Sequence, residues 1–74
     1  MSNDKPDYNS IAKRIFELRK KSKMTQEDFA DATGISSRMI SFMETGRRNA
    51  GIESLYNIAK NLKVSLDFLV FGAR

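Results

Sequence analysis

Cysteine and histidine are both absent from the 74 residues of this chain. Without cysteine there is no disulfide framework and no thiolate metal site. Without histidine, the commonest general base and the commonest metal ligand are missing as well. We therefore expect no enzyme activity, no cofactor and no metal site, since only carboxylates, lysine, tyrosine and hydroxyl groups remain for catalysis.

Long apolar runs are also missing, and the single proline lies in a polar segment at the start. No stretch is long enough to span a membrane, and residues 1–9 lack the apolar region of a signal peptide. The sequence therefore predicts a cytoplasmic protein with a disordered N-terminal arm over residues 1–9 and one domain over residues 10–72.

Positive charge is modest in total but unevenly distributed. The chain has 13 Lys and Arg residues against 9 Asp and Glu residues, which gives a net charge of +4. Six cations and one acid fall between Lys13 and Lys23, whereas three acids and no cation fall between Glu27 and Asp31. This balance is compatible with binding to nucleic acid or to an anionic membrane surface, and by itself it decides neither.

Apolar residues recur at helical spacing along the chain, and no segment alternates with a period of two residues. The first helix carries an apolar face and ends near Ser22, and Asn9 or Ser10 can cap its start. The caps of the four later helices are Thr25, Ser36, Gly51 and Ser65. The fourth helix has the clearest apolar stripe, made of Ile52, Leu55, Ile58, Ala59 and Leu62. The pattern predicts an all-α, compact five-helix bundle.

The segment from Gln26 to Thr45 has the pattern of two helices joined by a tight turn. Ala30 supplies a small side chain where the helices cross, and Gly34 supplies the positive φ that the turn needs. The residues expected to point inward are Phe29, Ile35, Ile40 and Met43. The second helix, at about residues 36–45, is thereby held with its first side chains projecting, and such a helix fits the major groove of DNA.

These residues resemble the Cro/CI-like (Xre-type) helix-turn-helix regulators of bacteria and phages over about residues 11–72. The resemblance is carried by Arg19, Met24-Thr25-Gln26, Ala30, Gly34, Ile40, the segment from Glu44 to Asn49 and the segment from Val64 to Leu69. It implies the lambda-repressor-like fold and sequence-specific binding of double-stranded DNA. The departures are Thr33, where an apolar residue is common, Phe42, where a polar residue is usual, and Ala50-Gly51, where Pro and then Ser or Thr are frequent.

The resemblance also implies roles for individual residues. The positions that face base edges are Ser37, Arg38, Met39 and Phe42. The positions that contact DNA phosphates are Gln26, Ser36, Arg47, Arg48 and Asn49. Arg19 and Glu44 match a pair that forms an internal salt bridge between the first and third helices.

Three aromatic residues near the end of the chain, Tyr56, Phe68 and Phe71, are more than a core of this size can enclose together with the other Phe and Tyr residues. Partial burial at the chain end is one explanation, and a homodimer surface is the other. We expect the dimer surface, because one recognition helix contacts too few base pairs to select a site from a genome.

The kind of regulator stays open at this point. A phage Cro-like repressor, a restriction–modification controller, a toxin–antitoxin regulator and the DNA-binding part of a longer repressor all fit the sequence. Such a protein regulates by occluding a promoter or by touching RNA polymerase. A second class of function also stays open, in which the chain is a protein-interaction module, such as an antitoxin-type regulator whose main partner is another protein.

Overall fold

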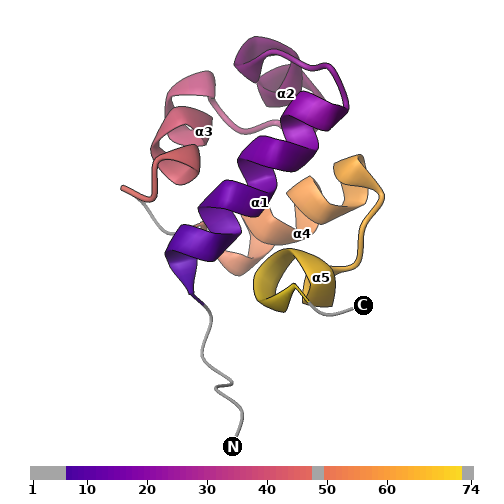
Figure 1. Ribbon diagram of the computed structural model, residues 1–74. Coiled ribbons are helices and arrows are strands. Elements are labelled where there is room, and N and C mark those ends of the chain that lie inside the picture. Colours follow the sequence, from indigo (N-terminus) through magenta and orange to yellow (C-terminus); the bar gives the residue numbers. More distant parts are fainter. Residues whose placement is uncertain (1–6, 48–49, 73–74) are drawn as a thin grey trace, which may run out of the picture.

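The computed structural model describes residues 7–47 and 50–72, and these residues form five α-helices and no strand. α1 (Tyr8–Lys21) crosses the middle of the molecule, with α3 (Ser37–Glu44) on one side and α5 (Leu66–Phe71) on the other (Figure 1). α2 (Gln26–Thr33) packs against α3 and α4, and α4 (Ile52–Leu62) also packs against α1 and α5. This arrangement confirms the predicted all-α bundle. Within the described ranges, no helix has the length and apolar character needed to cross a membrane.

Side-chain caps fix the first residue of most of these helices. α2, α3 and α5 begin directly after the predicted caps Thr25, Ser36 and Ser65. Each of these hydroxyls accepts a hydrogen bond from the backbone N–H three residues later, which satisfies a donor that the helix itself leaves unpaired. At the start of α2 the bond is reciprocal, because the side chain of Asp28 accepts from the backbone N–H of Thr25.

The start of α1 differs from the sequence prediction. Asp7 is the cap, rather than Asn9 or Ser10, so the helix begins at Tyr8. The Asp7 carboxylate accepts from the Ser10 hydroxyl at 2.8 Å and from the backbone N–H of Asn9 at 3.1 Å. These hydrogen bonds, that from Ser10 foremost, hold the pKa of Asp7 below its usual value. The capping residues predicted from sequence thus lie inside the first turn. The rest of the predicted arm, residues 1–6, lies outside the described residues.

One core joins all five helices. The most deeply buried side chains are Ile15 of α1, Phe29 of α2, Ile40 and Met43 of α3, Ile58 of α4 and Leu69 of α5. Burial of a side chain of this size stabilises the fold by about 1.5–3 kcal/mol. Because α2 and α3 both contribute to the same core as α1 and α4, the pair is held rigidly on the rest of the domain.

Ile52 is an exception to the apolar stripe predicted for α4. Its side chain is 69% exposed, whereas Leu55, Ile58 and Ala59 are buried. Ile52 is the first residue of α4, and Leu55, one turn later, is the first residue of the stripe that reaches the core. The prediction that Ile52 faces the core is therefore wrong. Ile52 instead adds apolar surface one turn before Tyr56, which is also exposed.

Candidate nucleic-acid interface

The turn between α2 and α3 depends on two residues. Gly34 ends α2 with a φ of 76°, and no heavy atom lies within 4 Å of the place where a Cβ would be. Glycine is therefore needed there for its backbone conformation and not for space. The buried hydroxyl of Thr33 donates to the backbone oxygen of Phe29 at 2.8 Å and accepts from the backbone N–H of Ile35 at 3.3 Å. These two bonds explain how a polar residue is accommodated where the family pattern favours an apolar one.

α3 has one buried face and one open face. Ile40 and Met43 anchor it in the core, whereas Ser37 and Arg38 are exposed at its first turn. Phe42 follows one turn after Arg38 and is half-buried. Met39 is also half-buried, but it packs against the core. Of the four residues predicted to face DNA bases, Met39 is thus the one held against the protein.

Arg19 and Glu44 form an ion pair between α1 and α3, at the two positions where the sequence predicted one. The Arg19 Nε atom donates to Glu44 Oε2 at 2.6 Å, and Nη2 donates to Oε1 at 3.0 Å. The two side chains are only 8% and 3% exposed. The hydrogen bonds to Glu44 raise the pKa of Arg19 above its usual value, because they outweigh the cost of removing the guanidinium from water.

Two more groups complete this buried network. Arg19 Nη1 donates to the backbone oxygen of Met24 at 2.7 Å, and the side-chain amide of Gln26 donates to Glu44 Oε1 at 3.1 Å. The network therefore joins the end of α1, the turn that follows it, the first residue of α2 and the last residue of α3. Gln26 was predicted to bind phosphate, and in this structure one of its two amide N–H groups is directed at Glu44.

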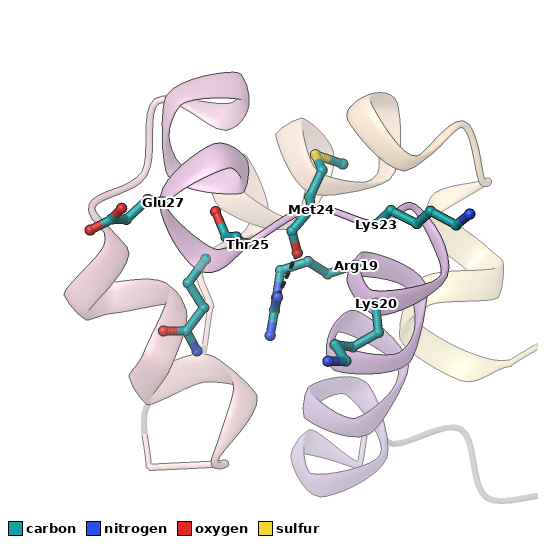
Figure 2. A pocket seen from close by; sticks show the side chains of 7 residues that line it. Arg19, Lys20, Lys23, Met24, Thr25 and Glu27 are labelled. Carbon is teal, nitrogen blue, oxygen red and sulfur yellow. Dashed lines mark hydrogen bonds between the residues drawn. The ribbon is translucent and has the colours of Figure 1, made fainter.

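A cleft of about 710 Å³ opens where α1 ends and α2 begins. Arg19, Lys20 and Lys23 line it together with Thr25 and Gln26, and Glu27 is the acidic residue of the lining. Figure 2 shows Arg19 and Lys20 pointing into the space between α1 and α3, next to the start of α2, whereas Lys23 points outward. Glu44 balances the charge of Arg19, so the positive charge of the cleft comes from Lys20 and Lys23. The cleft lies at the N-terminus of α2, where helix geometry also favours an anion.

A family model described as helix-turn-helix matches residues 15–69 of the chain. The chain is 36% identical over 62 residues to the uncharacterized HTH-type transcriptional regulator YqaE of Bacillus subtilis (strain 168), a match that covers 84% of this chain and 53% of that protein. The chain belongs to the Cro/CI-like (Xre-type) helix-turn-helix family. It spans about half the length of this curated relative.

Two solved structures have the same fold as this helix-turn-helix domain. One is the P22 c2 repressor in complex with synthetic operator 9T, with 32% identity and a TM-score of 0.80. The other is the restriction-modification controller protein C.AhdI from Aeromonas hydrophila, with 25% identity and a TM-score of 0.80. Each match covers 85% of this chain and 96% of the other. These matches confirm the lambda-repressor-like fold that the sequence predicted.

The segment after α3 begins with a constrained turn in this helix-turn-helix domain. Gly46 has a φ of 76°, and a Cβ there would lie 2.7 Å from the Asn9 side-chain oxygen. The backbone conformation therefore requires glycine, whereas the exposed Asn9 side chain can rotate away from a Cβ. Arg47 is exposed, and its backbone N–H donates to the oxygen of Phe42 at 2.9 Å. Arg48 and Asn49, the other predicted phosphate-binding residues of this loop, lie outside the described residues.

The three residues predicted for a dimer surface differ in exposure. Tyr56 on α4 is 56% exposed and Phe71 at the end of α5 is 48% exposed, whereas Phe68 is half-buried. α4 and α5 pack on each other, so all three lie on one pair of helices. Ile52, which the apolar periodicity assigned to the core, is a further exposed apolar residue of α4.

Arg14 has a structural role that sequence reasoning missed. Its Nη1 atom donates to the backbone oxygens of Leu69 and Val70, both at 3.1 Å, and so caps the C-terminus of α5. A Cβ at Gly72 would lie 2.8 Å from Arg14 Nη2, so this glycine leaves room for the guanidinium. No local signal could reveal the contact, because the partners are 55 and 56 residues apart along the chain.

Proposed function

We propose that this chain is a sequence-specific, double-stranded-DNA-binding transcription regulator that binds an operator as a homodimer, with α3 in the major groove. One observation carries the proposal: α3 is anchored by Ile40 and Met43 while Ser37 and Arg38 project from its first turn. A rigid short helix with free polar side chains at its start is the element that reads base edges in this type of domain.

The surroundings of α3 support binding to the DNA backbone. In the proposed complex, Gln26 uses its second amide N–H on a phosphate, and Ser36 before α3 and Arg47 after it contact further phosphates. Lys20 and Lys23 add positive charge at the neighbouring cleft. Such contacts fix the orientation of the protein and supply affinity that does not depend on sequence.

The exposed apolar residues of α4 and α5 support dimerisation. Tyr56 and Phe71 both expose aromatic surface, and the exposure of Ile52 enlarges the apolar surface beside Tyr56. Aromatic residues are enriched in the cores of such interfaces. Two copies paired through this surface would present two α3 helices to half-sites about one turn of DNA apart, ~34 Å.

A selection of binding sites from random duplexes tests the proposal. We expect an enriched motif with two inverted half-sites spaced by about 10 base pairs between their centres. Retention of all duplexes without enrichment of any sequence would contradict the proposal.

The exposed apolar surface of α4 and α5 also supports the alternative function, a module that binds another protein. Sedimentation of the purified chain separates the two. A concentration-dependent dimer supports the regulator, whereas a strict monomer that shows no selected DNA site favours the interaction module.

A further inference from the structure

Arg38 and Phe42 form a pair on the open face of α3. They are four residues apart, so their side chains lie on the same side of the helix. The Arg38 Cζ atom lies 5.9 Å from the centroid of the Phe42 ring, within the range of a cation–π contact. At an exposed site such a contact is worth about 0.5–1 kcal/mol, so it favours this position of the guanidinium before any ligand is present.

The pairing leaves the hydrogen-bonding edges of Arg38 open. An aromatic ring contacts the face of a guanidinium, whereas the N–H groups point outward in its plane. Among residues 7–47 and 50–72, no hydrogen bond or ion pair engages the Arg38 side chain. Its fork of donors matches the O6 and N7 acceptors that guanine presents in the major groove.

A hollow adjoins this fork. It has a volume of about 310 Å³ and is lined by Ser36, Arg38, Met39 and Phe42, so two of its four lining side chains are apolar. Successive base pairs are about 3.4 Å apart, so a ring whose centroid lies 5.9 Å from the guanidinium can reach the base pair next to the guanine. The apolar group that the major groove offers there is the C5-methyl of a pyrimidine.

We propose that Arg38 and Phe42 act as one unit that recognises a guanine next to a C5-methylated pyrimidine, with the guanidinium on the guanine and the Phe42 ring against the methyl group. This inference rests on the proposed function, and it names the chemistry of the bases that α3 selects. Thymine and 5-methylcytosine both carry this methyl group, so binding responds to cytosine methylation at that position as well.

Base analogues in the selected site test the proposal on the unmodified protein. We expect a thymine beside a guanine in each half-site. Deoxyuridine in place of that thymine in one half-site removes a single methyl group, and we expect affinity to fall about fourfold, the value of one buried methylene-sized group. At the same position, a 5-methylcytosine·G pair should bind about fourfold tighter than a C·G pair. In addition, 7-deazaguanine at the neighbouring guanine should weaken binding by about fivefold or more.

Variants then assign the two effects to the two side chains. Phe42→Ala should bind thymine and deoxyuridine sites equally, whereas Phe42→Leu should keep a preference for the methyl group. Arg38→Ala should lose its sensitivity to 7-deazaguanine. A selected site that tolerates deoxyuridine at every thymine would overturn this inference and leave the proposed function standing. The absence of any selected site would overturn both.

Discussion

Replacing Glu44 by alanine should destabilise the domain strongly, because it leaves the buried guanidinium of Arg19 without its counter-ion. The change removes the two hydrogen bonds from Arg19 and the one from Gln26. Removing one partner of a fully buried ion pair costs about 3–5 kcal/mol. Arg19 keeps its bond to the Met24 oxygen, and the cleft beside it admits water, so we expect about 2–3 kcal/mol.

Thermal and urea unfolding measure this cost. In a domain of this size, 1 kcal/mol corresponds to a shift of about 4–8 °C in Tm, so Glu44→Ala should lower Tm by about 10–20 °C. Glu17→Ala is the matched control, because it removes the same charge from an exposed position of α1. The control should change stability by no more than about 0.5 kcal/mol. If both variants melt at the same temperature, the network does not stabilise the fold.

A double variant measures the interaction between Arg19 and Glu44 separately from their contacts with other residues. Arg19→Met combined with Glu44→Leu removes both charges and leaves apolar groups in their place. Replacement of a buried ion pair in this way is often neutral or stabilising. The double variant should therefore be more stable than Glu44→Ala alone. If the change in unfolding free energy of the double variant equals the sum of the changes in Arg19→Met and in Glu44→Leu, Arg19 and Glu44 do not interact energetically.

The remaining predictions concern three other residues. Arg47→Ala should weaken binding to all DNA sequences. The slope of log K against log[salt] should become flatter by about 1.8, because the homodimer then neutralises two phosphates fewer, and an unchanged slope would mean that Arg47 is only a solvated charge. Phe71→Asp should give a folded monomer with weak operator binding, and a dimer that persists in sedimentation would place the interface elsewhere. Arg14→Ala should lower the free energy of unfolding in urea by about 1–2 kcal/mol, because two carbonyls of α5 lose their donor. Lys13→Ala, at an exposed neighbouring position, is the control. An equal loss of stability in both variants would contradict this role of Arg14.

Features that depend on neighbours along the chain could be predicted from the sequence. The hydroxyls of Thr25 and Ser36 accept hydrogen bonds from backbone N–H groups three residues later. Gly34 adopts the positive φ that commonly follows the end of a helix. The inward positions of Phe29 and Ile40 follow from helical periodicity. The same local rules predict the wrong cap for α1, because Asp7, Asn9 and Ser10 are all capable caps.

Features that depend on distant contacts or on the ends of helices could not be predicted. Ile52 fits the periodicity of α4, yet it is the first residue of the helix and its side chain is largely exposed. Arg14 belongs to the run of cations between Lys13 and Lys23, and no local pattern reveals that its partners are carbonyl groups of α5. Lys23 and Lys63 adopt a φ of 60° in turns after helices, a conformation that the sequence does not reveal because glycine is its usual occupant.

We propose that α3 reads base edges through the side chains of its first turn. Equilibrium binding of the wild type and of Arg38→Ala, each to the selected site and to a scrambled duplex at one salt concentration, tests this role. Arg38→Ala should lose about 1–3 kcal/mol per half-site on the selected site and keep its affinity for the scrambled duplex. An equal loss on both duplexes would contradict the claim and reduce Arg38 to a phosphate contact.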